Sequence, residues 1–469
     1  MKRRVIVEDF GKIKHAELEM KPMMMFVGDN NSGKSYLMSL LWGLLSDTSQ
    51  ILTHLTDEVR NSKLYEECGR YVRELIGGGE ERRSLSQEWV ERFWRLLNCC
   101  IEQNKDQFVS DIFNKNMYIG KLELEGEDLL NFEIGTRTEY SVERRNRRGK
   151  EDVEHEHKRM IYICIDSGIQ IGTRITENYK AKTGRYVEFI LSVFLRQWIG
   201  WYKKLDLHMM GKNSIVFLPS SRTGFVLSKN LLINNIYENS FNRFTNVIQE
   251  DIREEQDSYF TKPVISFLKL LNNIGDRESG RLKLGQLADF IEQTILHGKV
   301  EIQNAISKSF MYKPESFNEP IQMYLASAIV TEITPLYLLC KYRYGMSQMF
   351  IEEPEMCMHP KLQVMVARVL VRLCNMGVPV TMTTHSDIMI QHINNMLRVK
   401  NSDKKQELMA KYKIEEQDLL GTEEVGVYQF SCQGNESSQV VELMASEMGF
   451  ETTTFSDAFE EMLELTYDI

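Results

Sequence analysis

One eight-residue segment near the N-terminus constrains the fold of this chain more than any other. Gly28 and Gly33 are separated by four residues and followed by Lys34 and Ser35, a pattern typical of phosphate-binding loops. An apolar run at 23–27 precedes the loop and predicts a buried strand, and a helical pattern follows it. The loop must present several backbone N–H groups to one anion, so it needs glycines where a Cβ would clash. The segment therefore predicts a strand, a phosphate-binding loop and a helix in succession.

The residue types in this loop suggest separate roles. Lys34 would place a positive charge at the β- and γ-phosphates of a nucleotide, and the Ser35 hydroxyl would hold Mg²⁺. The N-terminal dipole of the following helix would add to the attraction for phosphate. The expected nucleotide-binding residues of the loop are Gly28, Asn30, Asn31, Ser32, Gly33, Lys34 and Ser35.

Composition sets broad limits on the class of protein. The 469 residues are 42% hydrophobic and 26% charged, an ordinary globular profile that is long enough for two or three domains. No stretch of about 20 apolar residues occurs, so we expect no membrane span and a cytoplasmic location. The eight cysteines include no Cys-x-x-Cys pair, which argues against zinc. A net charge of −10 argues against a chain that coats nucleic acid along its whole surface.

Two further strand ends carry polar side chains suited to the same site. The apolar run 349–351 ends in Glu352 and Glu353, and in parallel sheets such strand ends form the ligand site. Glu352 would approach Mg²⁺, and Glu353 would orient or deprotonate the attacking water. His385 follows the apolar run 378–382 and would hydrogen-bond the γ-phosphate or that water. The alternatives are a polar turn for the carboxylates and a structural role for the histidine.

Two basic features are less specific. Arg222 lies in the turn 218–224 (LPSSRTG) after a short apolar strand, where it could donate a bidentate pair to phosphate or carboxylate. The alternative is a structural salt bridge. The run 144–150 (RRNRRGK) could bind DNA phosphates or an acidic protein, but acidic residues follow it at once, and a solvated hairpin tip is the simpler interpretation.

Taken in order, these motifs resemble the ABC-type ATPases of the RecF and OLD (overcoming-lysogenization-defect) group, which are AAA15-like. Within that group, the size and the 218–224 turn resemble the stand-alone ATPase subunits of bacterial anti-phage systems such as PARIS and Septu. The matching segments are 9–13 (DFGKI), 28–35 (GDNNSGKS), 352–355 (EEPE) running into 359–360 (HP), and 384–386 (THS).

The resemblance implies an α/β fold, an ABC-type P-loop ATPase head with a mixed sheet and helical insertions, that binds ATP and Mg²⁺. It implies that Glu353 is the catalytic base and that Arg222 stands where the glutamine loop usually stands. Ser327 matches the signature serine that reaches a nucleotide across a dimer, although Ala328 and Ile329 replace the usual glycine. This departure predicts either slow hydrolysis or an unusual dimer.

The resemblance also implies partners. We expect a homo-oligomer, at least a dimer, that acts as a sensor or scaffold for a separate nuclease effector and responds to a phage-encoded trigger protein or DNA. The segment after 428 is shorter than the Toprim domain of OLD nucleases, so we expect no nuclease activity in this chain. The alternatives are a RecF-like repair ATPase acting directly on DNA and a transporter ATPase subunit, against which the missing Leu-Ser-Gly-Gly signature argues.

The same pattern predicts a domain organisation. The expected segments are an N-terminal part of the head at 1–48, a helical and β middle region at 49–210, a strand and turn at 211–229, a helical insertion at 230–296, a C-terminal part of the head at 297–430 and a C-terminal tail at 431–469.

Overall fold

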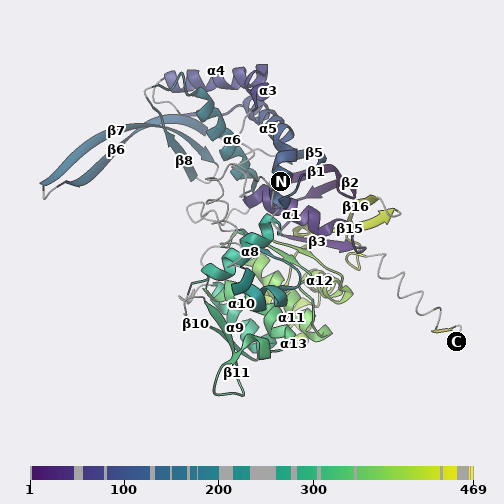
Figure 1. Ribbon diagram of the computed structural model, residues 1–469. Helices are drawn as coiled ribbons and strands as arrows, with labels where there is room; N and C mark the ends of the chain where they lie inside the picture. The colour runs from purple at the N-terminus through teal and green to yellow at the C-terminus, as the bar shows by residue number, and fades with distance from the viewer. Residues whose placement is uncertain are drawn as a thin grey trace, which may run out of the picture. The chain divides into compact units, whose positions relative to one another are not determined.

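The chain divides into two compact units, drawn in Figure 1 from a computed structural model. The first comprises Met1–Ile6, Asp47–Phe108 and Lys121–Lys203, and the second comprises Val7–Ser46, Val109–Gly120 and Lys204–Ile469. The structure describes residues 3–46, 56–78, 82–126, 133–147, 150–165, 169–176, 178–199, 215–232, 260–275, 283–303, 308–342, 346–433, 437–451, 464, 466 and 467.

A nine-stranded sheet contains the predicted motif strands. Its order is β5-β1-β2-β16-β15-β3-β14-β13-β9. At its centre β3 pairs in parallel with β14, β14 with β13, and β13 with β9. All six residues of β3 are buried, as expected for a parallel strand covered on both faces. The bounds are β1 Arg3–Phe10, β2 Ile13–Glu19, β3 Met23–Gly28, β5 Ile119–Gly126, β9 Ile215–Leu218, β13 Gln348–Glu352 and β14 Val380–Thr383.

The sheet is mixed because the chain returns to it near the C-terminus. Strand β15 (Val425–Gln433) lies parallel to β3, and β16 (Ser437–Leu443) lies antiparallel to β15 and parallel to β2. The sequence-based boundary at 430 falls inside β15, and residues expected in a tail form a strand of the sheet. The predicted mixed α/β fold is confirmed.

Helices supply the apolar side chains that cover this sheet. Side chains of α8, α9, α10 and α11 join those of β3, β9, β13 and β14 in one core cluster. The expected helical insertion at 230–296 thus contributes core residues through α8 and α9, and its parts at 233–259 and 276–282 lie outside the described residues. The bounds are α1 Lys34–Ser46, α8 Lys262–Asn273, α9 Lys283–Ile291, α10 Ala328–Tyr342, α11 Pro360–Asn375, α12 Asp387–Lys400 and α13 Lys405–Tyr412.

A three-stranded sheet leads into α10. Its strands are β10 (Gly298–Gln303), β11 (Ser309–Pro314) and β12 (Ile321–Gln322), and the 3-10 turn η3 (Met323–Leu325) follows. The other short helical turns of this unit are η2 Glu292–Leu296, η4 Glu416–Asp418 and η5 Thr422–Glu424.

The first unit contains helices and a four-stranded sheet of order β4-β6-β7-β8. Strands β6 and β7 pair with each other over their whole length, whereas β4 and β8 pair only with their ends near 133–135 and 160–165. The rest of the β6–β7 pair forms a two-stranded arm, whose tip residues 148 and 149 in the expected basic run lie outside the described residues. The bounds are α3 Asp57–Arg60, α4 Lys63–Gly77, α5 Gln87–Phe113, α6 Thr183–Ile199, β4 Arg82–Ser84, β6 Glu133–Arg147, β7 Lys150–Ile165 and β8 Ile169–Arg174.

Candidate nucleotide site

The predicted phosphate-binding loop connects β3 to α1. Gly28 and Gly33 have φ angles of +116° and +99°, which favour glycine, and Asn31 lies in the left-handed region at +59°. A Cβ at Gly28 would lie 2.0 Å from the carbonyl oxygen of Phe430, so no other residue fits there. Asn30, Asn31 and Ser35 are exposed, and the loop therefore offers polar groups to solvent.

The side chain of Lys34 is buried inside this loop. Its side chain is only 6% exposed, and Nζ donates hydrogen bonds to the carbonyl oxygens of Gly28 at 3.0 Å and Asp29 at 2.5 Å. Burial lowers the pKa of Lys34 to about 8, and the nearby carboxylates of Asp29 and Glu353 oppose that shift. The loop thus holds a buried ammonium group whose partners are mostly neutral carbonyls, which suits the arrival of an anion.

Strands β15 and β16 hold the backbone of the phosphate-binding loop through hydrogen bonds. The Phe430 carbonyl accepts the Asp29 N–H at 3.1 Å, and the Cys432 N–H donates to the Asp29 carboxylate at 2.9 Å. The Ser438 hydroxyl donates to the Ser32 carbonyl at 2.6 Å. Our reading of the sequence missed these supports, although the strand-like alternation at 425–443 was a signal for them.

Ser35 and Glu352 meet where α1 begins and β13 ends. The Ser35 side chain hydrogen-bonds the Glu352 carboxylate, which also accepts the Ser220 N–H at 3.0 Å. Burial raises the pKa of Glu352, and these two hydrogen bonds oppose the rise. A hydroxyl beside a carboxylate is an oxygen donor set of the kind that Mg²⁺ prefers. The residues present therefore fit the expected magnesium ion, and in the described parts of the chain no cluster of three His, Cys, Asp or Glu side chains offers another metal site.

Glu353 follows directly in a backbone conformation that is uncommon for glutamate. Its φ is +41°, in the left-handed region, and such strain at a strand end persists only when the surroundings hold it. Its N–H donates to the Thr383 carbonyl at 3.0 Å, and its carbonyl accepts from the Arg222 guanidinium at 3.0 Å. The half-buried carboxylate is close enough to Lys34 to affect the pKa of that lysine.

His385 lies beyond the end of β14, near the same lysine. Burial lowers the pKa of His385, and the charge of Lys34 lowers it further, so the imidazole is neutral at pH 7. Its backbone N–H donates to Glu355 at 2.7 Å, and the Thr384 hydroxyl donates to the same carboxylate oxygen at 2.8 Å. Glu355, to which we assigned no role from the sequence, therefore anchors the His385 loop.

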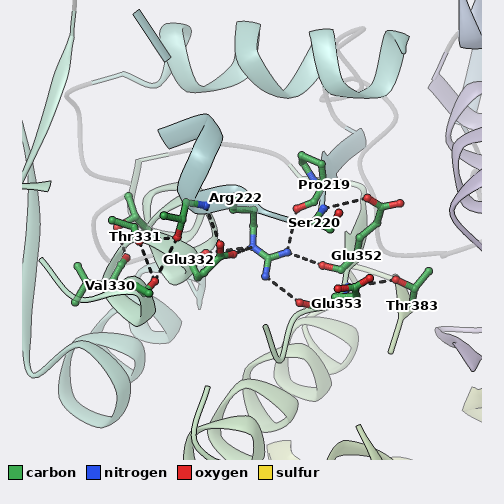
Figure 2. Close-up of polar contacts among 12 residues, drawn as sticks. Pro219, Ser220, Arg222, Val330, Thr331, Glu332, Glu352, Glu353 and Thr383 are labelled. Carbon is green, nitrogen blue, oxygen red and sulfur yellow. Dashed lines mark hydrogen bonds and ion pairs between the residues drawn. The ribbon is translucent and has the colours of Figure 1, made fainter. Parts of the chain in front are cut away.

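Arg222 differs from its predicted role as a phosphate ligand. Its side chain is 1% exposed and forms an ion pair with Glu332 at 3.0 Å, while its other donors bind backbone carbonyls of the protein (Figure 2). The guanidinium is occupied inside the fold, as the alternative interpretation, a structural salt bridge, expected.

Ser327 lies at the start of α10 and its side chain is exposed. Its carbonyl accepts the N–H groups of Val330 and Thr331, at 3.0 and 3.2 Å. The neighbouring Tyr324 and Leu325 are 69% and 64% exposed. This serine therefore faces solvent with two large apolar side chains beside it.

The solved structures that this chain resembles include SMC heads, at about 10% identity. The Smc head bound to the C-winged helix domain of ScpA has a TM-score of 0.36 and 10% identity, covering 94% of this chain and 98% of that chain. A Pyrococcus furiosus Smc head with an extended coiled coil has a TM-score of 0.35, 10% identity and 99% coverage of both chains. The Thermotoga maritima SMC head has a TM-score of 0.33 and 9% identity, covering 94% of this chain and 98% of that chain. Among curated proteins, no match was found.

A family model decides the assignment. The AAA ATPase domain model (AAA_15) matches residues 1–390, a span that includes the phosphate-binding loop, Glu352, Glu353 and His385. The chain belongs to the AAA_15 family of AAA ATPase domains.

Proposed function

We propose that this protein binds and hydrolyses ATP as the cytoplasmic sensor and scaffold subunit of a bacterial anti-phage complex that controls a separate nuclease. The observation that carries the ATPase part is the convergence of Lys34, the Ser35–Glu352 pair, Glu353 and His385 around one loop. The defence role rests on the resemblance to PARIS and Septu ATPase subunits. Among the described helices, none has the length and apolarity to cross a membrane.

The residues divide the chemistry among them. Lys34 exchanges its loop carbonyls for the β- and γ-phosphates, and the loop N–H groups bind the same oxygens. Mg²⁺, held by Ser35 and Glu352, would neutralise charge on these phosphates. Glu353 accepts the proton of the attacking water, and the neutral His385 donates a hydrogen bond to the γ-phosphate or accepts one from that water.

The exposed end of α10 supports a shared site. Ser327 lies on a different segment from Lys34, and exposed apolar side chains such as Tyr324 and Leu325 mark interaction surfaces when they cluster beside a functional group. We infer that Ser327 of one subunit reaches the nucleotide held by Lys34 of another, and that burial of Tyr324 and Leu325 stabilises the pair.

The two-stranded arm is our candidate surface for the effector. An isolated hairpin is marginally stable in water, and the part of β6–β7 beyond β4 and β8 has no further paired strand among the described residues. A binding partner would stabilise it. The sequence of the arm is rich in both positive and negative charges, which suits a polar protein surface.

The buried lysine predicts a pH dependence of ATP binding. Because the pKa of Lys34 in the free protein is about 8, the group loses its proton above that pH, and ATP must then restore it. We expect ATP affinity to fall by up to about tenfold per pH unit above pH 8, with proton uptake on binding. Calorimetry in buffers of different ionisation enthalpy measures both. Affinity that stays constant from pH 7.5 to about 9.5 would contradict the buried-lysine interpretation.

Rising pH changes the folding stability of the free protein in the opposite direction to its ATP affinity. The unfolded chain keeps its lysine protonated up to the ordinary value of 10.5, so between about 8 and 10.5 the unfolded state binds more protons. The contribution of Lys34 to the free energy of unfolding therefore rises with pH in this window, while ATP binding weakens.

Assembly is the direct test of the shared site. Light scattering of the Glu353→Gln variant with ATP and Mg²⁺ should give at least twice the mass of one chain, because bound ATP would be trapped between subunits. Ser327→Tyr should lower the mass, and Ser402→Tyr, which changes a serine distant in sequence from the site, should not. A strictly monomeric mass at micromolar concentration would remove the shared site and the scaffold role.

The defence role needs a different measurement. Cells carrying this gene and its neighbouring genes should survive phage challenge, and the Lys34→Ala variant should not. Co-purification of a nuclease with the wild-type chain supports the effector assignment. Direct binding of DNA by the isolated chain, with no protection against phage, would favour the RecF-like alternative.

A further inference from the structure

Arg222 links the two carboxylate residues of the site to another element. The residue begins a helix at 222–232, and its guanidinium donates to the carbonyl oxygens of Glu352 at 2.5 Å and Glu353 at 3.0 Å (Figure 2). A third bond goes to the Pro219 carbonyl at 3.1 Å. One buried cation thus holds the backbone on which the metal-side and water-side carboxylates are mounted.

The opposite side of the guanidinium contacts α10. Arg222 Nε donates to the Glu332 carbonyl at 3.2 Å and lies 3.0 Å from the Glu332 carboxylate, and both side chains are 1% exposed. The other Glu332 oxygen accepts the Thr223 N–H at 2.8 Å. A charge pair this deeply buried cannot separate without leaving an unpaired charge in the core, so its elements move together.

A second contact continues from this pair to the exposed end of α10. The hydroxyls of Thr223 and Thr331 lie 2.7 Å apart, and the Thr331 hydroxyl donates to the Ala328 carbonyl at 2.8 Å. Ala328 follows Ser327 directly. The first turn of α10 is therefore bonded to the 219–223 turn, which in turn is bonded to the backbone of Glu353.

The strained conformation of Glu353 makes this connection consequential. At φ +41° the residue depends on its surroundings: its carbonyl accepts from Arg222 and from the Met356 N–H at 3.1 Å, and its N–H donates to the carbonyl and hydroxyl oxygens of Thr383. A small displacement of α10 would reach the carboxylate of Glu353 through Arg222. Misplacement of a catalytic group by about 1 Å lowers rates substantially.

We propose that Arg222, joined to the first turn of α10 through the Thr223–Thr331 hydroxyl contact, is a positioning residue that couples contact at Ser327 to the placement of Glu353 in the same subunit. This inference rests on the proposed shared site. When the neighbour's nucleotide engages Ser327, α10 fixes Glu353 at the subunit's own nucleotide, so the two sites of a dimer hydrolyse cooperatively.

A conservative substitution tests the link without disturbing the buried charges. Arg222→Ala would leave Glu332 buried and unpaired, and unfolding would mask the effect. Thr331→Val instead removes only the hydroxyl between Ala328 and Thr223. Thr334→Val is the matched control, because Thr334 is also buried on α10 and its hydroxyl donates within the helix, to the Val330 carbonyl at 2.6 Å, rather than to the 219–223 turn.

We expect wild type and Thr334→Val to hydrolyse ATP cooperatively, with a Hill coefficient above 1 and at most about 2 for two sites. Thr331→Val should show a Hill coefficient close to 1 and a kcat about tenfold lower, with ATP affinity and ATP-dependent mass unchanged and a melting temperature no lower than that of Thr334→Val. A merely structural threonine would change the melting temperature and leave the Hill coefficient alone.

The outcomes separate the two proposals. If wild type dimerises and hydrolyses ATP but Thr331→Val matches Thr334→Val in kcat and Hill coefficient, the coupling is wrong and the proposed function stands. If wild type is monomeric with ATP, the shared site fails and the coupling fails with it.

Discussion

Lys34→Ala should lower ATP affinity by about 100-fold or more, equivalent to about 3 kcal/mol. The variant removes the buried positive charge that the loop holds beside the phosphate position, and charge-assisted hydrogen bonds are the strongest in such a site. Isothermal titration calorimetry with ATP and Mg²⁺ measures the loss. The variant should also abolish ATP-dependent assembly.

An exposed lysine supplies the control. Lys361 lies in the first turn of α11, is exposed, and its substitution by alanine should leave ATP affinity within about twofold of wild type. Because burial lowers the pKa of Lys34, its replacement should not unfold the free protein, and thermal melting checks this. Wild-type affinity in Lys34→Ala would mean that the nucleotide binds elsewhere.

The part of the site that could be predicted from the sequence is the part encoded by short segments. A phosphate-binding loop needs its glycines, lysine and hydroxyl within eight residues, and Gly28, with φ +116° and no room for a Cβ, shows why the pattern is so restrictive. Glu352 was placed beside Ser35 for the same kind of reason, since both follow parallel strands and such strand ends meet at one edge.

The rest could not be predicted because it depends on pairing between distant segments. All partners of Arg222 except Pro219 lie about 110 to 130 residues further along the chain, and nothing in the 218–224 turn distinguishes a guanidinium that binds phosphate from one that binds backbone carbonyls. The supports of Asp29 and Ser32 come from Cys432 and Ser438, about 400 residues away. We assigned 431–469 to a tail, and the alternation at 425–443, even where it is compatible with strands, does not say that they lie beside β3 and β2.

The left-handed backbone conformation of Glu353 could not be predicted from the sequence either. The apolar run 349–351 predicts a strand that ends at the carboxylates, but not that the chain turns to φ +41° there. The turn aims consecutive side chains differently: Glu352 contacts Ser35, whereas Glu353 is close enough to Lys34 to affect its pKa. Two adjacent glutamates can therefore serve as a metal-side ligand and a water-side base.

This division of roles predicts the effect of Glu353→Gln. Glutamine keeps the shape of the side chain and the backbone bonds to Thr383 and Arg222, but its amide cannot accept a proton from water. We expect ATP affinity within a few-fold of wild type and hydrolysis slower by about 100-fold or more, the usual scale for a positioned base. Single-turnover hydrolysis beside equilibrium ATP binding measures both quantities.

Two neighbouring substitutions make the assignment specific. Glu355→Gln keeps an oxygen to accept the Thr384 hydroxyl and the His385 N–H, so its effect on the rate should stay below about tenfold. Glu352→Gln replaces the charged carboxylate beside Ser35 by a neutral amide, which is a poorer ligand for Mg²⁺. It should therefore raise the Mg²⁺ concentration needed for ATP binding, a change that Glu353→Gln should not cause. Unchanged turnover in Glu353→Gln would move the base to Glu352 or His385. In that case His385→Gln and Glu352→Gln, compared at saturating Mg²⁺, would distinguish the two: the substitution that slows single-turnover hydrolysis of bound ATP by about 100-fold or more identifies the base.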